Sequence, residues 1–345
     1  MADAADPGRS VDVGEAAGPQ ALVTLEAVRA AAATLRGIAT RTPLVPFGPP
    51  GARRYLKAES LQPIGAFKIR GAYVAIASLT AAERARGVIT YSSGNHAQGV
   101  ARAARLLGAR AVVVMPSDAP ALKRARVEVD GAEVVIVGTS SDERQHVAER
   151  IAAERGLAII PPYDDDRIIA GQGTVGLEIA EDLPEVAAVL VPIGGGGLAS
   201  GVAVAIRALV PGARLIGVEP ELAADARQSL REGRIVRWSP ADSSRTIADG
   251  TRTTAIGRRN FAHLSRLLDD IVTVSESEIA AGVRLAAEES RLVAEPSGAL
   301  TVAALAFRST EAGLDHLVGP IVAVVSGGNV EPELYRSFLE TPVPR

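Results

Sequence analysis

The sequence predicts an α/β protein with mostly parallel sheets and helices on both sheet faces, and three observations support this. Short apolar segments rich in Val and Ile alternate with helical segments along the chain, an order typical of parallel sheets. Most of these short segments are apolar on both sides rather than alternating, as strands covered on both faces must be. The length of 345 residues then allows about two domains with sizeable cores.

The expected elements follow in chain order. Residues 1–20 are rich in Ala, Asp, Gly and Pro without periodicity and predict a disordered tail. Between Thr24 and Gly37, apolar side chains recur every three or four residues and predict a helix that the glycine ends. Strands are expected over residues 87–91, 110–115, 133–137, 157–160, 187–193, 214–220 and 320–325. Helices are expected between them, over residues 95–107, 141–155 and 198–209 among others.

The segment PPYDDD at residues 161–166 divides the predicted strands into two blocks. Its prolines and acids indicate a hinge-like loop between two parts of the fold. We expect the three aspartates to be solvated and to end in the N-cap of a helix.

Composition excludes several classes of function. The 37 basic and 40 acidic side chains leave a net charge of −3, which argues against a nucleic-acid partner. The absence of cysteine excludes disulfides, thiolate metal sites and cysteine nucleophiles. The N-terminus has no apolar run typical of a signal peptide, and no segment approaches the roughly 18 uncharged apolar residues of a membrane span. We therefore expect a cytoplasmic protein without a membrane partner.

The strongest local signal is VPIGGGGLASG at residues 191–201. Four glycines between a strand and a helix let the backbone approach an anion, and the helix N-terminus adds unpaired N–H groups. The pattern predicts a phosphate-binding loop. A dinucleotide fold is a competing interpretation, because Glu219 closes the next strand at a suitable spacing, but Ala199 stands where that fold's third glycine belongs.

A second signal is Lys68, which follows the turn PIGAF and begins an apolar helix. Burial lowers the pKa of a lysine, and a deprotonated amine is what a Schiff base with an aldehyde cofactor requires. Taken alone, Lys68 is better explained as a surface lysine at a helix start.

Two further turns follow predicted strands. YSSGNHAQGVA at residues 91–101 offers successive N–H groups that suit a carboxylate, although a helix N-cap explains the same residues. VVSGGNV at residues 324–330 delivers Ser326 into a glycine turn.

Together and in this order, the segments resemble the fold-type II pyridoxal-phosphate enzymes, and among them the threonine/serine dehydratase and serine racemase group. The resemblance covers residues 25–330 approximately and includes the stretches IAGQGT (169–174), TIADG (246–250) and EPSGA (295–299). It implies a tryptophan-synthase-β-like fold with pyridoxal phosphate between two open twisted α/β domains. The implied large domain comprises residues 21–80 and 166–345, and a small mobile domain, residues 87–164, carries the substrate-carboxylate loop. A homodimer is the family expectation.

The resemblance also implies roles for individual residues. Lys68 would bind the cofactor aldehyde and then remove and return the substrate's α-proton. The phosphate would lie against Gly194, Gly195, Gly196, Gly197 and Leu198. Phe67 would pack on the ring face, Asn95 would face the ring 3-hydroxyl, and Ser326 would face the pyridine nitrogen. The substrate carboxylate would be held by Ser92, Ser93, Gly94, Asn95 and His96, with Arg144 near the hydroxyl-bearing end.

A serine opposite the pyridine nitrogen has chemical consequences, because a neutral hydroxyl does not hold that nitrogen protonated as a carboxylate would. Expelling a β-substituent is then favoured over transamination. The expected function is an L-threonine/L-serine dehydratase that forms a 2-oxo acid and ammonia from an amino-acid substrate.

Three alternatives stay open. Ser93 matches the residue that supplies a proton from the face opposite the lysine in the racemases, so a serine racemase is possible. A dehydratase for hydroxyaspartate or phenylserine is another alternative. From a different class, a nicotinamide-dependent oxidoreductase would use the same glycine loop.

A divalent cation is also expected. Glu219, Ala223 and Asp225 have the spacing of the divalent site of the serine racemases, where the carbonyl at the alanine position is a ligand. Carboxylate and carbonyl oxygens suit Mg²⁺, Mn²⁺ or Ca²⁺. A solvated helix start is the alternative interpretation of this segment.

Overall fold

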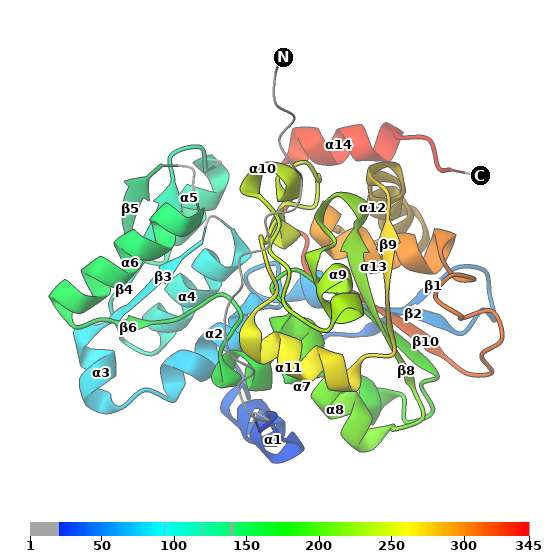
Figure 1. Cartoon of the computed structure of the whole chain (residues 1–345), viewed down its shortest axis with the longest axis horizontal. Helices are drawn as coiled ribbons and strands as arrows, with labels where there is room; N and C mark the ends of the chain where they lie inside the picture. Colours follow the sequence, from blue (N-terminus) through cyan, green and yellow to red (C-terminus); the bar gives the residue numbers. More distant parts are fainter. Residues whose placement is uncertain (1–20, 93, 120, 139–140, 345) are drawn as a thin grey trace.

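The computed structural model describes residues 21–92, 94–119, 121–138 and 141–344, and within them the chain forms two sheets in two lobes (Figure 1). The larger sheet has the order β1-β2-β10-β7-β8-β9 and the smaller has the order β5-β4-β3-β6. All neighbouring strands are parallel except the pair β1 and β2. The predicted α/β fold with mostly parallel sheets is therefore confirmed.

The strands of the larger sheet are β1 (Leu44–Phe47), β2 (Arg54–Ala58), β7 (Ala188–Pro192), β8 (Arg214–Pro220), β9 (Asp270–Val274) and β10 (Ile321–Val325). Those of the smaller sheet are β3 (Val88–Tyr91), β4 (Ala111–Pro116), β5 (Glu133–Val137) and β6 (Ala158–Ile159). The helices are α1 (Leu25–Thr34), α2 (Lys68–Ala77), α3 (Ala81–Arg86), α4 (Asn95–Leu106), α5 (Ala121–Val129), α6 (Ser141–Arg155), α7 (Asp166–Asp182), α8 (Gly197–Leu209), α9 (Asp225–Glu232), α10 (Pro240–Ser243), α11 (Arg258–Leu267), α12 (Glu276–Ser290), α13 (Pro296–Phe307) and α14 (Pro332–Glu340). Short 3₁₀ helices are η1 (Glu59–Leu61), η2 (Glu221–Ala223) and η3 (Asp249–Thr251).

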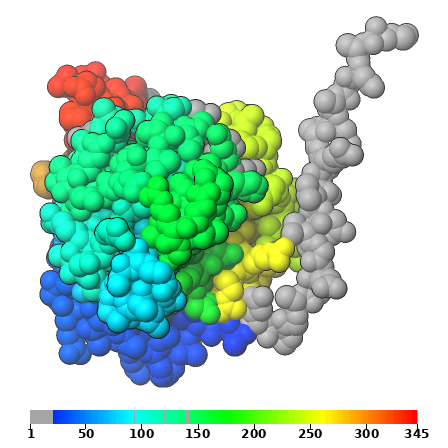
Figure 2. All heavy atoms as spheres, turned by 90° about the vertical axis from the view of Figure 1, so that its left-hand side faces the viewer, coloured from blue at the N-terminus to red at the C-terminus, as the bar shows by residue number. Residues whose placement is uncertain are grey.

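Helices cover both faces of the smaller sheet. Ile151 and its neighbours on α6 pack on one face, and Ala97 of α4 with Val127 of α5 pack on the other. Figure 2 views this lobe from outside, where α3 (cyan) and α6 (green) lie at the surface. Because both faces are buried, these strands have the apolar sequences that predicted them.

The larger sheet is covered in the same way. Helices α12 and α13 pack on one face, and α7, α8 and α11 pack on the other.

No helix in the described part of the chain is long and apolar enough to cross a membrane. The C-terminal ends of β7 and β10 lead directly into the glycine loop and the turn at Ser326, so parallel topology brings both to one edge of the sheet.

All seven predicted strands form, but the sequence did not reveal β1, β2 and β9. Strand β1 contains Pro46 and lies at the sheet edge, where a proline is tolerated. Strand β2 contains Lys57, whose side chain is fully buried. Asp165 accepts a hydrogen bond from the Arg167 amide and caps α7, which confirms the predicted cap, while Gly94 occupies the N-cap position of α4.

A buried ionic cluster anchors the start of α2. Arg70 donates to both carboxylate oxygens of Glu59 at 2.8 Å and to Glu178 at 2.6 Å. Lys57 donates to Glu178 at 2.6 Å, so two cations and two anions alternate. Burial alone would raise the pKa of Glu59, but the charge and hydrogen bonds of Arg70 hold that pKa below its ordinary value. The cluster ties α2, and with it Lys68, to β2, η1 and α7.

Replacing Arg70 by methionine is expected to lower the free energy of unfolding by about 3–5 kcal/mol, because Glu59 would lose its charge partner while buried. Urea denaturation measures the change. The control is Arg124→Met, which removes an exposed ion pair with Glu128 and should cost less than about 1 kcal/mol. Equal losses for the two variants would contradict a structural role for the cluster.

Candidate active site

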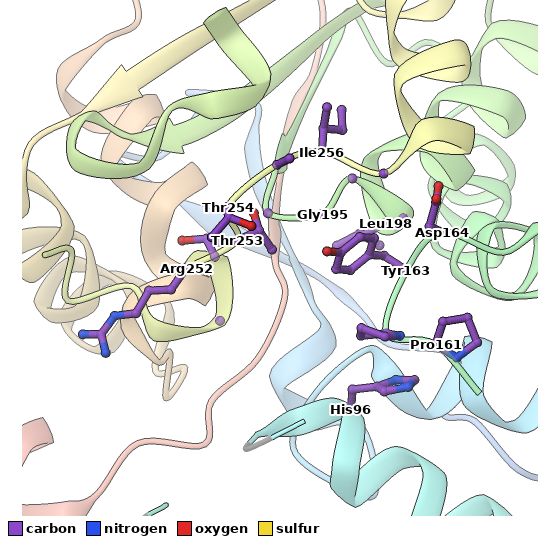
Figure 3. A pocket seen from close by; sticks show the side chains of 18 of the residues that line it. His96, Pro161, Tyr163, Asp164, Gly195, Leu198, Arg252, Thr253, Thr254 and Ile256 are labelled. Atoms are coloured by element: carbon purple, nitrogen blue, oxygen red, sulfur yellow. The ribbon is translucent and has the colours of Figure 1, made fainter. Parts of the chain in front are cut away.

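A cleft with a volume of about 1080 Å³ is lined by residues from both lobes (Figure 3). Its lining contains Phe67, Lys68, Ser92, Gly94, Asn95, His96, Arg144, Gly194, Gly195, Gly196, Gly197, Leu198 and Ser326. These are all the cofactor- and substrate-binding residues expected from the sequence except Ser93, which lies outside the described residues. The structure thus brings together segments that are up to about 260 residues apart, from Phe67 to Ser326.

Lys68 is the first residue of α2 and reaches into this cleft. Its Nζ donates a hydrogen bond to the Pro162 carbonyl at 2.7 Å and lies 5.1 Å from the centre of the Phe67 ring. Burial lowers the pKa of Lys68 to about 8. About a tenth of the amine is therefore uncharged at pH 7, far more than for an ordinary lysine, and this form can act as a nucleophile or base.

The sequence contains three lysines, and their partners differ. Lys57 pairs with Glu178 in the ionic cluster, and Lys123 pairs with Asp249. Lys68 donates to a neutral carbonyl, and no carboxylate of the described residues lies within ion-pair distance of it. Lys68 is consequently the lysine whose charged form is least stabilised by its surroundings.

The glycine loop supplies unpaired donors. The amides of Gly194, Gly195 and Gly196 donate to no acceptor among the described residues, and Gly195 and Gly196 are buried. Helix α8 begins at Gly197, so its first amides also lack intrahelical acceptors. Gly196 has a φ of 96°, which a residue with a side chain rarely adopts. Buried donors at a helix N-terminus suit an anion such as a phosphate.

The loop after β3 contributes Ser92, Gly94, Asn95 and His96. The Gly94 amide donates to the Ser92 hydroxyl at 3.3 Å. His96 is buried and its Nε2 lies 3.0 Å from the Ile160 carbonyl, while Nδ1 has no partner in the described part of the chain. Burial, and then the charge of Lys68, lower the pKa of His96 to about 3, so this histidine is neutral.

Polar contacts join the two lobes across the cleft. Asn95 donates to Glu295 at 2.6 Å and accepts from Asn329 at 2.8 Å. Lys123 of α5 bonds Asp249 of η3 nearby. Burial, reinforced by the charge of Asp249, raises the pKa of Glu295 to about 8, so this carboxyl group is protonated at neutral pH.

Ser326 and Arg144 complete the lining. Ser326 is buried at the end of β10, and its hydroxyl lies 3.5 Å from the Ser297 carbonyl, a weak contact that leaves the hydroxyl available to another group. The Ser326 carbonyl accepts a hydrogen bond from the Phe67 amide at 3.0 Å, which connects β10 to the segment carrying Lys68. Arg144 of α6 is half-buried, and burial lowers the pKa of its guanidinium.

The three residues expected to hold a cation lie beside the cleft rather than in its lining. Glu219 and Asp225 are buried, and Glu219 accepts hydrogen bonds from the amides of Ala226 and Arg227 at 3.1 and 2.7 Å. Burial raises the pKa of Asp225 to about 7, and burial with the charge of Asp225 raises the pKa of Glu219. The nearby Ile256 backbone and Thr253 side chain lower the pKa of Asp225 and so offset part of the effect of burial. Even so, neither Asp225 oxygen reaches a donor at hydrogen-bonding geometry in the described residues.

Comparison with known proteins identifies the family. A family model described as a pyridoxal-phosphate dependent enzyme matches residues 35–327. The chain belongs to this family.

Its relatives include several lyases. An L-threo-3-hydroxyaspartate ammonia-lyase from Saccharomyces cerevisiae is 43% identical over 290 residues, which cover 84% of this chain and 86% of the relative. An L-threonine ammonia-lyase from Thermotoga maritima is 42% identical over 314 residues, covering 90% and 76%. The solved structure of maize serine racemase superimposes with a TM-score of 0.87 at 36% identity and covers 93% of this chain and 98% of its own. The protein is thus a pyridoxal-phosphate dependent lyase by family, and the alternative of a nicotinamide-dependent oxidoreductase is wrong.

The cleft of this pyridoxal-phosphate enzyme fits its cofactor. The unpaired amides at residues 194–196 suit the phosphate, and Lys68 offers an amine of lowered pKa to the aldehyde. Several residues that complete the site were not singled out from the sequence: Tyr163, Lys123, Asp249, Asn260 and Glu295. Asp249 and Glu295 lie in TIADG and EPSGA, which carry the family resemblance without pointing to these two side chains. Tyr163, Lys123 and Asn260 are isolated residues that only their contacts in the structure identify.

The raised pKa of Glu295 predicts a pH dependence of stability. An unfolded glutamate has a pKa near 4.3, so between about pH 5 and 8 the folded chain holds a proton that the unfolded chain releases. The free energy of unfolding of the cofactor-free enzyme should therefore fall as pH rises through this window. Glu295→Gln, which has no proton to lose, should show a shallower fall by urea denaturation.

The control for this prediction is Glu288→Gln, because Glu288 is exposed on α12. Its pH dependence should match that of the unmodified protein. A slope for Glu295→Gln that also matches would show that Glu295 is not protonated in the folded state.

Proposed function

We propose that the protein is an L-threonine/L-serine ammonia-lyase that converts a 3-hydroxy amino acid to a 2-oxo acid and ammonia by β-elimination. The observation that carries the proposal is Lys68, a cleft lysine without a carboxylate partner in the described structure and with a pKa lowered to about 8. The ammonia-lyases among its relatives support the same reaction class.

Bound pyridoxal phosphate would supply an aldehyde that links covalently to amines and a ring that spreads negative charge from the α-carbon. Lys68 would hold the aldehyde through Nζ and, once displaced by the substrate amine, would take the α-proton at the same atom. Gly194, Gly195, Gly196, Gly197 and Leu198 would hold the phosphate through their amides. Loss of the α-proton and of the β-hydroxyl would together release one water, and hydrolysis of the resulting enamine by a second water would give the 2-oxo acid and ammonia.

The other residues would orient the reactants. Phe67, Asn95 and Ser326 would contact the ring, and the hydroxyl of Ser326 favours elimination because it does not hold the pyridine nitrogen protonated as a carboxylate would. Ser92, Ser93, Gly94, Asn95 and His96 would bind the substrate carboxylate, because successive N–H groups in such a turn suit an anion.

Two specific observations favour second candidates at this site. A half-buried Arg144 in the cleft lining suits a substrate with a second carboxylate, and a relative is named a hydroxyaspartate ammonia-lyase. The serine at position 93 keeps racemisation available, since it would supply a proton on the face opposite Lys68.

We further propose a divalent cation (Mg²⁺, Mn²⁺ or Ca²⁺) held by Glu219, Asp225 and the Ala223 carbonyl. Glu219 and Asp225 are buried and their pKa values are raised, and both Asp225 oxygens lack a hydrogen-bond partner within the described residues. A hard cation would stabilise such a donor set. A homodimer in the cytoplasm is also proposed. Exposed apolar side chains of Leu61 and Val293 on adjoining segments support self-association, and the lack of cysteine fits a reducing compartment.

Release of 2-oxo acid from a panel of L-threonine, L-serine, 3-hydroxyaspartate and phenylserine tests the proposed reaction. We expect the highest kcat/KM with L-threonine or L-serine, and Lys68→Ala should lower turnover by at least about 10³-fold because it removes both the nucleophile and the base. Lys123→Ala is the matched control, because it deletes another cleft lysine that already has a carboxylate partner. A Lys68→Ala enzyme with activity like that of Lys123→Ala would refute the assignment.

Chelation tests the cation. Removal of divalent ions should lower the melting temperature and the activity together, and Mg²⁺ or Mn²⁺ should restore both. At a metal concentration of a hundred times Kd, the free energy of unfolding should rise by about 2.7 kcal/mol. Asp225→Ala should abolish this response and retain the cofactor absorbance. An enzyme that shows no metal on elemental analysis and no change on chelation would exclude the site.

A further inference from the structure

We propose that Asn260 of α11 is a positioning residue for the cofactor phosphate, acting through the glycine loop. The inference rests on pyridoxal phosphate being the cofactor, and adds to the proposed function a residue that contacts neither substrate nor cofactor.

The Asn260 side chain is fully buried behind the loop. Its Nδ2 donates to the Gly195 carbonyl at 2.7 Å, and the Gly257 amide donates to the same carbonyl at 3.1 Å. The Asn260 Oδ1 in turn accepts from the Ser200 hydroxyl of α8 at 3.3 Å. One amide side chain therefore connects the loop, α8 and α11.

These bonds fix the direction of the next amide. In a planar trans peptide the C=O and the following N–H point in opposite directions. Because the Gly195 carbonyl points toward α11, the Gly196 N–H must point away from it. That N–H is buried and donates to no acceptor in the described residues, so it is available to an anion.

The loop has little freedom to turn this peptide over. An added Cβ on Gly196 would lie 2.8 Å from the Cβ of Asn260, so the loop contacts α11 closely on one side. On the other side Tyr163 lies beside Gly195, with ring atoms 2.2–2.4 Å from where a Cβ on Gly195 would be (Figure 3). Peptide 195–196 is thus confined between Tyr163 and Asn260.

Helix α11 is held by residues 162–164, a segment that begins at the Pro162 carbonyl bonded by Lys68. Asp164 Oδ1 accepts from the Arg259 amide at 2.7 Å in the first turn of α11, and Pro162, two residues earlier, accepts from Lys68 Nζ. Residues 162–164 therefore contact Lys68, the glycine loop and α11. This arrangement fixes the distance between the amine and the phosphate amides.

The test compares pyridoxal phosphate with pyridoxal, which lacks the phosphate. Asn260→Asp keeps the side-chain shape but removes the donor, and Asn260→Ala removes the whole amide. Each should weaken pyridoxal phosphate binding to the cofactor-free protein by about tenfold or more, the range of a hydrogen bond to a charged group. Pyridoxal binding should change by less than about twofold. Absorbance titration measures both dissociation constants.

The matched control is Leu264→Ala, which removes a buried side chain one turn further along α11. It should lower the melting temperature and leave the ratio of the two dissociation constants unchanged. The inference is overturned if the Asn260 variants weaken both compounds equally, as a purely structural role predicts, or weaken neither. Failure of the unmodified protein to bind pyridoxal phosphate would instead refute the proposed function, so the two failures are distinguishable.

Discussion

The rest of the site depends on one constraint, the buried backbone donors of the glycine loop, which have no acceptor in the part of the chain that the structure describes. A buried N–H group that lacks a partner is costly, so the amides of Gly195 and Gly196 require an anion when the enzyme is complete. Their position after β7 and before α8 fixes where that anion lies in the fold. The other functional groups face this loop from three places in the fold. Lys68 lies across the cleft, Ser326 follows the adjacent strand β10, and the loop after β3 belongs to the opposite lobe.

Parallel topology explains why these segments meet. Strands β3, β7 and β10 all end in glycine-containing turns that line the same cleft. The polar pair Asn95–Glu295 and the ion pair Lys123–Asp249 then join the lobes across it. Behind the cleft, Ile69 and Ile76 of α2 pack with Val100 of α4 in one buried apolar cluster, so the lobes share apolar packing as well as these polar contacts.

Much of this could be predicted from the sequence, because the informative residues are local. Four successive glycines, a lysine in an apolar segment and a serine in a glycine turn each have a physical meaning without knowledge of the fold. Strand β2 was not predicted because Lys57 and Arg54 make it look polar, and only the ionic cluster with Glu178 explains a lysine buried there. Asn260 and Tyr163 were not found either, since an isolated Asn or Tyr has no pattern until the structure places it against Gly195.

The central claim is that Lys68, and not another lysine, holds the cofactor. Reduction of the complete enzyme with borohydride fixes pyridoxal phosphate to the lysine that binds it, and peptide mapping by mass spectrometry identifies that residue. The sequence contains three lysines: positions 57 and 68 share the peptide 55–70 after cleavage at arginine, and position 123 falls in the peptide 111–124. Fragment-ion spectra of the peptide 55–70 distinguish label on Lys57 from label on Lys68. We expect label on Lys68 and none on Lys57 or Lys123. Label on Lys57 or Lys123, or no visible absorbance from bound cofactor before reduction, would contradict it.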